Sequence, residues 1–383
     1  MSNYKEALIE LFKQPSVHNN SFSYIDLLRD KKIIVYGAGG GAVSFFTFVL
    51  RRYGLKAQIV LDRKFQSGDF YLDVPSCAPF EYQPTEDEKI DAIVVVTVIT
   101  KQYQEEIFKC LKSMGFRNII LSSDIYEYHL LHPPTELIER GFDYYLDNKE
   151  KILSCLDIFS DNLSSNVFVS VVETHIKKSP TAISISPMEE QYFPRDINLS
   201  KGYSRFINCG AYNGDTVLKL NALYGKIDLI VCFEPDSENF GSLSKYLSAK
   251  HSEIAQSVMA FPCGVFSHET QLRFSCGDKV NSAISDEGDS VVQCVSLDHV
   301  IPGCKPTFIQ MDVEGAELEA LKGAEALLKE NKPDLAICVY HAPNHIWDIP
   351  LYLESLCLGY VFYLRNYTSF VAETVLYATV PKE

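Results

Sequence analysis

Apolar and polar positions alternate in a regular order through the second half of the chain, from about residue 206. Short apolar runs of strand type are separated by amphipathic patterns of helix type. The pattern predicts strands at 206–209, 228–233, 257–263, 307–311 and 334–340, helices at 214–224, 237–250 and 315–330, a polar hairpin at 271–276 and 291–296, and a closing strand pair near 360–365 and 373–379. We therefore expect an α/β fold in which a doubly wound sheet ends in an antiparallel strand pair.

The first half of the chain shows a shorter version of the same alternation. Strand-like runs are expected at 31–39, 57–61, 92–99 and 118–122, with helices at 42–53 and 102–114 between them. These elements predict a small Rossmann-like domain over residues 1–125. Residues 126–200, with several prolines around helical patterns, are expected to form a partly helical connector, so that the second Rossmann-like domain covers 201–383.

Composition and charge narrow the classes of protein. The 383 residues are 46% hydrophobic and 22% charged, which suits a globular protein with two cores. A formal net charge of −15 gives no general attraction to phosphate backbones, so nucleic acid is not an expected partner. The eleven cysteines lack metal-type pair spacing, and we expect them to be reduced in the cytoplasm. No apolar stretch reaches the roughly 18 residues that span a bilayer, so no membrane insertion is expected.

Candidate chemistry begins at a glycine turn after the first strand of the second domain. The segment FINCGAYNGDT at 206–216 places Gly210 and Gly214 where the strand passes into a helix, and such a turn lets a ligand approach backbone N–H groups. Plain strand-to-helix turns use glycine as well. Glu234 ends the next strand in VCFEPD, where a carboxylate either accepts hydrogen bonds from ribose hydroxyls or caps a helix. The two features together favour a nucleoside ligand.

A further acidic residue ends the strand that precedes the last predicted helix of this domain. In the segment FIQMDVEGAELEALKGAEALL, Asp312 follows the strand and Glu314 opens the helix. The carboxyl ends of parallel strands converge on one crevice, so we expect Asp312 to face the same site as Gly210 and Glu234. The alternative is that Asp312 or Glu314 only caps the helix.

These segments together resemble the FkbM family of S-adenosylmethionine-dependent methyltransferases. The matching stretches, in order, are FINCGAYNGDT, FEPDSENF, PCGVF at 262–266, SLDHVI at 296–301, FIQMDVEGAELEALKGA and VYHAPNHIWDIPLYLESL. They extend over about half of the chain, and the ordered set is far more specific than any single stretch.

The resemblance implies a cofactor, an acceptor and a set of site residues. It implies S-adenosyl-L-methionine as the cofactor and O-methylation of a sugar hydroxyl, in polysaccharide or glycoside biosynthesis. Gly210, Asn213 and Gly214 would line the methionine part of the cofactor, Glu234 would hold its ribose, and Asp312 would border the transfer site. The expected partner is a small-molecule or glycan acceptor, with a nucleotide-sugar among the candidates.

Two features leave the chemistry of the second domain open. The family often has Asp at the position of Asn208, and an amide there hydrogen-bonds without offering charge to the cofactor's cationic groups. The base is either His341, which follows a strand, or Asp312, with His345 a weaker candidate. No metal is expected, although Asp312 and a neighbouring carboxylate could hold a divalent cation.

The first domain carries a glycine turn of its own. YGAGGGA places Gly37 and Gly39 in dinucleotide-binding spacing, and Asp62 ends the next strand. The turn also resembles that of small Rossmann-like domains attached to sugar-modifying enzymes, so a nucleotide or nucleotide-sugar is a candidate ligand. A turn kept only for packing explains the same residues equally well.

The sequence therefore favours a methyltransferase over two other classes. One is a nicotinamide-dependent sugar oxidoreductase or epimerase that uses the first glycine turn, and it is weakened because no Tyr/Lys catalytic pair is evident. The other is a non-enzymatic module that binds nucleotides. The acceptor, the position methylated and the oligomeric state are not indicated by the sequence.

Overall fold

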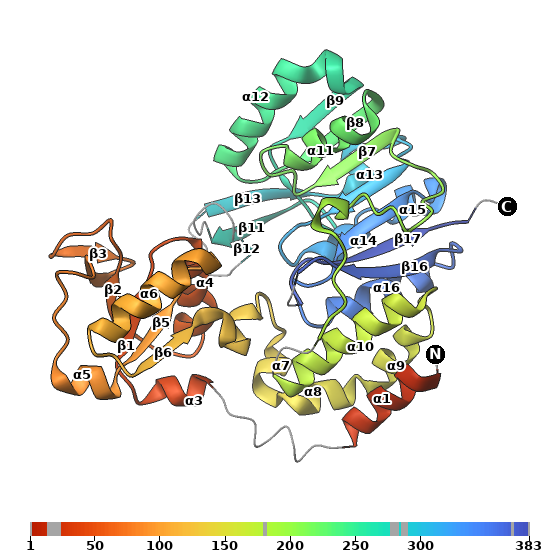
Figure 1. The fold of residues 1–383 in the computed structure, drawn as a ribbon. Coiled ribbons are helices and arrows are strands. Elements are labelled where there is room, and N and C mark those ends of the chain that lie inside the picture. Colours follow the sequence, from red (N-terminus) through yellow and green to blue (C-terminus); the bar gives the residue numbers. More distant parts are fainter. Residues whose placement is uncertain are drawn as a thin grey trace. The chain divides into compact units, whose positions relative to one another are not determined.

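The computed structural model describes residues 2–13, 24–178, 182–275, 283–284, 290–368 and 371–381 (Figure 1). The chain divides into two compact units. Of the described residues, 24–131 form the N-terminal unit and all others form the C-terminal unit. Most of the segment expected to be a connector therefore belongs to the C-terminal unit, and so does the first helix.

The N-terminal unit is built on a six-stranded sheet with the order β3-β4-β2-β1-β5-β6. All neighbours are parallel except β3 and β4. Its strands are β1 (Ile33–Tyr36), β2 (Ala57–Leu61), β3 (Asp69–Tyr71), β4 (Val74–Cys77), β5 (Ile93–Val96) and β6 (Asn118–Leu121). Its helices are α3 (Tyr24–Arg29), α4 (Gly40–Phe45), the π-helix η1 (Phe46–Arg51), α5 (Glu86–Asp91), α6 (Lys101–Ser113) and the 3₁₀ turns η2 (Ser122–Asp124) and η3 (Tyr126–His129). The short pair β3 and β4 and helix α5 were not expected from the sequence.

The C-terminal unit contains a seven-stranded sheet with the order β16-β17-β15-β14-β7-β8-β9. Its strands are β7 (Arg205–Cys209), β8 (Ile227–Phe233), β9 (Ala255–Phe261), β14 (Phe308–Met311), β15 (Asp334–Cys338), β16 (Val361–Asn366) and β17 (Thr374–Thr379). β17 lies between β15 and β16 and is antiparallel to both, while the other neighbours are parallel. The predicted fold class, two Rossmann-like units with a closing antiparallel pair, is confirmed.

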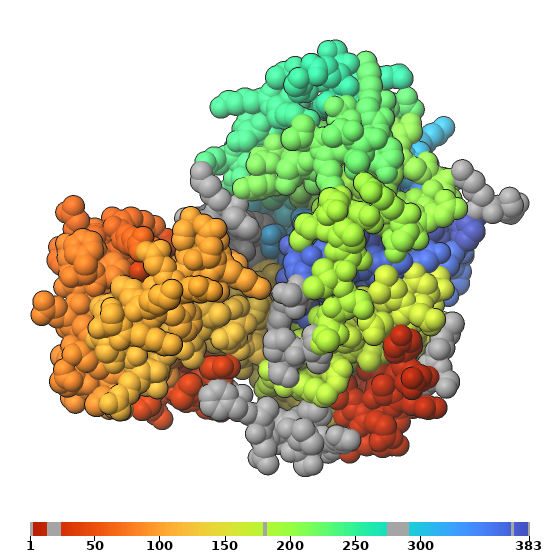
Figure 2. All heavy atoms as spheres, in the orientation of Figure 1, coloured from red at the N-terminus to blue at the C-terminus, as the bar shows by residue number. Residues whose placement is uncertain are grey.

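Helices of the C-terminal unit come from both ends of the chain. They are α1 (Ser2–Phe12), α7 (Thr135–Arg140), α8 (Phe142–Asp147), α9 (Lys149–Leu156), α10 (Asn162–Lys177), the 3₁₀ turn η4 (Met188–Glu190), α11 (Asp215–Tyr224), α12 (Ser237–Ile254), α13 (Leu297–Val300), α14 (Glu317–Lys322), α15 (Glu325–Asn331) and α16 (His345–Ser355). In the space-filling view, α12 lies at the surface of this unit (Figure 2). Its buried residues Leu243, Leu247 and Ile254 recur at helical spacing, which fixes one face of the helix toward the sheet.

Two sequence expectations about helices need correction. The predicted helix at 315–330 is divided into α14 and α15 around Gly323, where the chain packs so closely that a Cβ atom would lie 2.0 Å from the carbonyl oxygen of Phe266. The carbonyl of Gly323 accepts hydrogen bonds from Asp298 N and Ser296 Oγ, which are not part of the helix. His345 was expected in a loop, but it is the first residue of α16 despite Pro350 within that helix.

A smaller sheet with the order β10-β13-β11-β12 accompanies the main one. Its strands are β10 (Gly264–Val265), β11 (Thr270–Ser275), β12 (Ala283–Ile284) and β13 (Ser290–Val295). β11 and β13 form the antiparallel pair expected as a hairpin, and residue 276 of that expectation lies outside the described residues.

Side chains of the seven-stranded sheet alternate between two hydrophobic cores. On β7, Phe206 packs with α11 and α12, whereas Ile207 and Cys209 pack in the core that contains residues of α1, α9, α10 and α16. Helices therefore cover both faces of the sheet, as a doubly wound sheet requires. The described cysteines are free, and most are buried.

None of the helices within the described ranges combines the length and the apolar composition needed to cross a membrane.

Candidate functional site

The glycine turn after β7 brings two strand ends together. Gly210 has a φ of +82° and Gly214 a φ of +94°, which glycine adopts without strain. A Cβ atom on Gly210 would lie 1.9 Å from the carbonyl oxygen of Asp312, and one on Gly214 would lie 2.9 Å from Cδ1 of Tyr246. Packing alone therefore requires both glycines. Asn213 between them is exposed.

Unpaired polar atoms lie just before this turn. Asn208 is fully buried, and neither Oδ1 nor Nδ2 has a hydrogen-bond partner. Gln310, its register neighbour on β14, is also buried, and its Oε1 has no partner. Buried amide groups are normally satisfied by protein, water or ligand, so this part of the sheet has spare hydrogen-bonding capacity.

Glu234 directly follows β8 and is 6% exposed. Its Oε2 accepts a hydrogen bond of 2.7 Å from Tyr212 N in the glycine turn, and its Oε1 accepts one of 2.9 Å from Asp236 N at the start of α12. Burial raises the pKa of Glu234 to about 7, although the two backbone N–H groups oppose the rise. The predicted cofactor acid thus already joins the glycine turn to the next helix.

Asp312 follows β14 and forms hydrogen bonds with two other segments. Its backbone N donates to Cys209 O at the end of β7, and its Oδ2 accepts a 2.8 Å hydrogen bond from the hydroxyl of Tyr192. Tyr192 has a φ of +67°, and its own N donates to the hydroxyl of Tyr377 on β17. Through Tyr192, the segment before β7 therefore contacts Asp312 at the carboxyl ends of the parallel strands.

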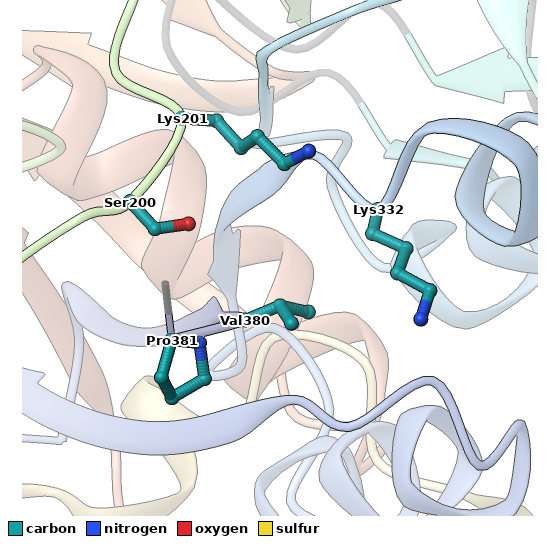
Figure 3. A pocket seen from close by; sticks show the side chains of 5 residues that line it. All are labelled: Ser200, Lys201, Lys332, Val380 and Pro381. Atoms are coloured by element: carbon teal, nitrogen blue, oxygen red, sulfur yellow. The ribbon is translucent and has the colours of Figure 1, made fainter. Parts of the chain in front are cut away.

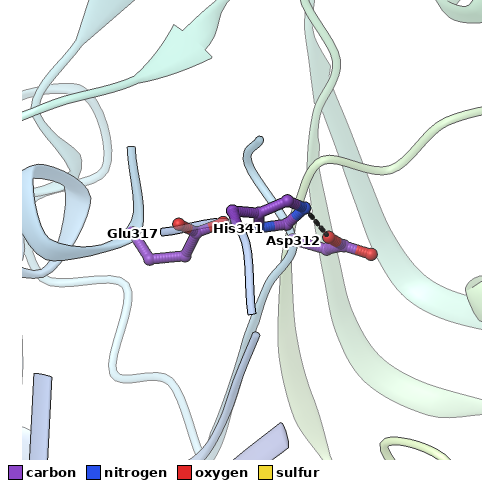
Figure 4. A group of neighbouring side chains, drawn as sticks. All are labelled: Asp312, Glu317 and His341. Carbon is purple, nitrogen blue, oxygen red and sulfur yellow. Dashed lines mark ion pairs between the residues drawn. The ribbon is translucent and has the colours of Figure 1, made fainter. Parts of the chain in front are cut away.

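His341 lies in a group of carboxylates at the same edge (Figure 4). Its Nδ1 is 2.7 Å from Oε1 of Glu317, and its Nε2 is 3.4 Å from Oδ1 of Asp312 and 3.5 Å from Oε2 of Glu314. Glu317 also lies 3.2 Å from Nδ1 of His345. Both His341 and Glu317 are buried, at 1% and 0% exposure. The two histidines considered as bases are thus linked by one buried acid.

The charged side chains in this group strongly shift one another's pKa values. Burial would lower the pKa of His341, but the carboxylates of Glu317, Glu314 and Asp312 outweigh it and raise that pKa to about 10. Burial would raise the pKa of Glu317, and the two imidazole rings instead hold it well below its usual range. The pKa of Glu314 rises to about 8, mainly through burial. These carboxylates therefore favour the protonated form of His341.

Asp312, Glu317 and His341 bring potential ligand atoms within 4.8 Å of one another, a spacing compatible with a metal ion. Figure 4 shows the imidazole ring between the two carboxylates, however, and each carboxylate faces a different ring nitrogen. One ion at the usual distance of about 2.1 Å from an imidazole nitrogen would contact only one of the two acids. An ion-pair chain describes these three residues better than a coordination sphere.

The sequence pattern did not single out Glu317 or Tyr192 as site residues. Glu317 lies on the apolar face of α14 with buried Ala320 and Leu321 three and four residues on, and a charged residue on an apolar stripe was the available signal. Tyr192 stands beside Phe193 and a proline, a pattern equally typical of packing. Only the fold shows that its hydroxyl reaches Asp312.

The N-terminal glycine turn has mixed features. A Cβ atom on Gly37 would lie 2.8 Å from Oγ1 of Thr97, so packing explains this glycine, whereas one on Gly39 would meet nothing within 4 Å. Asp62 directly follows β2, and its Oδ2 accepts a 2.8 Å hydrogen bond from Ala38 N. The acid and the turn are therefore adjacent, but part of the acid's hydrogen-bonding capacity is used within the protein.

A pocket of about 190 Å³ lies in the C-terminal unit, and Figure 3 shows the side chains that line it. It is lined by Ser200, Lys201, Lys332, Val380 and Pro381. Lys332 precedes β15 and Val380 follows the antiparallel β17, so the pocket faces the amino ends of the parallel strands. It contains none of the polar groups described above.

Comparison with known proteins gives a match to one family model and similarity to several solved structures. Residues 208–367 match the family model of the methyltransferase FkbM domain. The crystal structure of methyltransferase FkbM from Methylobacillus flagellatus KT is similar over 98% of both chains, with a TM-score of 0.69 and 20% sequence identity. Fibrillarin from Aeropyrum pernix, solved with natively bound S-adenosyl-L-methionine, is matched more weakly, with a TM-score of 0.33, 10% identity and coverage of 49% of this chain and 72% of that one. No curated protein matches the sequence.

The sheet order is that of a Rossmann-like α/β fold, which this chain shares with the methyltransferase from Methylobacillus flagellatus. The match to the FkbM methyltransferase domain is limited to residues 208–367, and the rest of the chain lies outside it.

Proposed function

We propose that this chain is an S-adenosyl-L-methionine-dependent O-methyltransferase that acts on a sugar hydroxyl, in cytoplasmic polysaccharide or glycoside biosynthesis. The observation that carries the proposal is the meeting of three polar strand ends at one edge of the sheet. Gly210 N donates to Phe233 O, just before Glu234, and Asp312 N donates to Cys209 O. The family supports methyl transfer, and the acceptor class is carried over from the sequence resemblance.

The residues at this edge fit the proposed cofactor. Glu234 offers a buried carboxylate for the ribose hydroxyls, and Asn208 has unpaired amide atoms that suit a polar amino acid tail. Gly210, Asn213 and Gly214 would border the methionine part. When bound, S-adenosyl-L-methionine supplies a methyl group made electrophilic by the sulfonium.

Asp312 is the base in this proposal. The cofactor would supply the methyl group to the acceptor oxygen and leave as the neutral thioether, so the chain's own residues would have to orient the hydroxyl and take up its proton. The hydroxyl proton passes to Oδ1 of Asp312, the oxygen that Tyr192 leaves free. His341, between Asp312 and Glu317, already carries its protons.

Mass spectrometry of the supernatant from denatured, freshly purified protein tests the proposal. The expected small molecule is S-adenosyl-L-methionine or its demethylated product. Retention of a nicotinamide cofactor would instead support an oxidoreductase that acts through the N-terminal turn.

We also propose that the N-terminal turn binds a nucleotide-linked acceptor, and the open space beside Gly39 supports this. Gly39→Ala adds a Cβ atom that meets nothing within 4 Å but would crowd a phosphate at the turn, so calorimetry should show weaker binding of a nucleotide-sugar to the full chain. Gly241→Ala on α12, also in open space, is the control. Equal binding by both variants would favour a turn kept for packing alone.

A further inference from the structure

Glu317 is a charged residue on the apolar face of a helix. It is wholly buried in α14, next to buried Ala320 and Leu321. A buried carboxylate is strongly unfavourable unless it is paired and hydrogen-bonded. The contacts around Glu317 therefore indicate what this residue does.

These contacts join three separate segments. Oε1 of Glu317 accepts backbone hydrogen bonds from Val313 N at 3.0 Å and from Gly315 N at 3.4 Å, in the loop after β14. The same carboxylate faces His341 after β15 and His345 at the start of α16. Glu317 thus fixes the loop that carries Asp312 and Glu314 relative to the imidazole that faces them.

We propose that Glu317 is a positioning residue that keeps His341 protonated, so that His341 serves as a fixed cation beside Asp312 and not as the base. The link to the base rests on the proposed function, whereas the protonation state of His341 does not.

Charged groups surround His341 on several elements. They are Glu317 on α14, Asp312 and Glu314 after β14, Glu373 before β17, His345 on α16, and the rings of His132 and Tyr340. Acids dominate this group, and Glu317 contributes most to raising the pKa of His341. A doubly protonated imidazole has no lone pair on either ring nitrogen, so it cannot accept the proton of a substrate hydroxyl.

The two nitrogen atoms of the His341 ring face different carboxylates. Nδ1 faces the fully buried Glu317, while Nε2 faces Asp312 and Glu314, whose side chains are 28% and 31% exposed. A substrate can therefore reach the carboxylates in front of the ring but not the one behind it. Glu317 acts on the reaction only through His341.

Titration of His341 in the unmodified full chain is the first test. NMR of histidine-labelled protein follows the ring, and His341→Gln assigns its signal by loss. We expect His341 to remain protonated at pH 8, with a midpoint near pH 10. A midpoint near the ordinary value of about 6.5 would overturn the proposal.

Substitution of Glu317 is the second test. Glu317→Gln keeps an oxygen that can accept from Val313 N but removes the charge, so the midpoint of His341 should fall by about 1–3 pH units. Glu319→Gln on the same helix is the matched control, because Glu319 pairs with Lys322 and Ser267 instead. A midpoint that is unchanged in Glu317→Gln, or equally shifted in both variants, would contradict the role given to Glu317.

Cofactor binding separates this inference from the proposed function. Calorimetry of the unmodified chain and of Glu317→Gln with S-adenosyl-L-methionine should give affinities within about threefold, because Glu317 lies behind His341. Absence of binding in the unmodified chain would count against the proposed function and leave the titration result intact. A loss of binding confined to Glu317→Gln would show that Glu317 shapes the cofactor site itself, against the role proposed here.

Discussion

The hydroxyl of Tyr192 donates a hydrogen bond to Oδ2 of Asp312, with 2.8 Å between the two oxygens. Tyr192→Phe should therefore lower the free energy of unfolding by about 1–2 kcal/mol, the usual loss for a hydrogen bond to a partly solvated carboxylate. Urea unfolding measures this change. Tyr363→Phe is the control, because among the described residues its hydroxyl has no hydrogen-bond partner. If both variants lost the same free energy of unfolding, the contact between Tyr192 and Asp312 would add nothing to stability.

Arg365 is a buried cation that joins the segments before β7 to β16. Its Nε lies 2.8 Å from Asp196 and its Nη2 2.7 Å from Asp161, which caps α10. Arg365→Met should destabilise the protein by about 3 kcal/mol, the low end for a broken buried pair, because both carboxylates stay partly exposed. Arg140→Met, at an exposed pair with Asp147, should change stability by less than about 1 kcal/mol in the same unfolding assay. If Arg365→Met lost less free energy of unfolding than Arg140→Met, the stabilising role given to Arg365 would be wrong.

Removal of divalent metal should not affect cofactor binding. His341 lies between Glu317 and Asp312, so no single ion is needed to hold these side chains together. Dialysis against a chelator followed by calorimetry with S-adenosyl-L-methionine should give the same affinity as before. Recovery of lost affinity on adding Mn²⁺, but not in Asp312→Asn, would instead establish a metal site at this edge.

Much of the C-terminal fold and of the candidate site follows from local sequence. Each strand that carries a candidate residue at its end is a fully or mostly apolar run, and the parallel order brings Gly210, Glu234 and Asp312 to one edge. Cofactor contacts at these positions stay predictions. Strands β3 (DFY) and β4 (VPSC) were not predicted because they are short and mix polar residues or a proline with their apolar residues.

Other parts of the site depend on contacts between distant segments. Glu317 is buried together with His341 and His345, which arrive from two later elements, and the apolar stripe of α14 does not identify these partners. Tyr192 reaches Asp312 through a left-handed backbone conformation and a contact with Tyr377. At the end of α14, the carbonyl of Gly323 accepts hydrogen bonds from Asp298 N and Ser296 Oγ, which belong to another segment. Such pairings are set by tertiary packing, which the periodicity of one segment does not encode.

The proposed ribose contact predicts a pH dependence of cofactor affinity. Because burial raises the pKa of Glu234 to about 7, its carboxyl loses the proton as pH rises through that value. Ribose hydroxyls bind the ionised form better, so affinity should rise by up to about tenfold between pH 6 and pH 8. In Glu234→Gln this dependence should vanish.

Calorimetric titration of the full chain with S-adenosyl-L-methionine at pH 8 is the most direct test of cofactor binding at the carboxyl edge of this sheet. The unmodified chain and Glu238→Ala, an exposed acid on α12, should bind one equivalent with equal affinity. Glu234→Ala should bind more weakly by about 2–3 kcal/mol, because a buried acceptor for the ribose is lost. Unchanged affinity in Glu234→Ala, or no binding by the unmodified chain, would contradict the account.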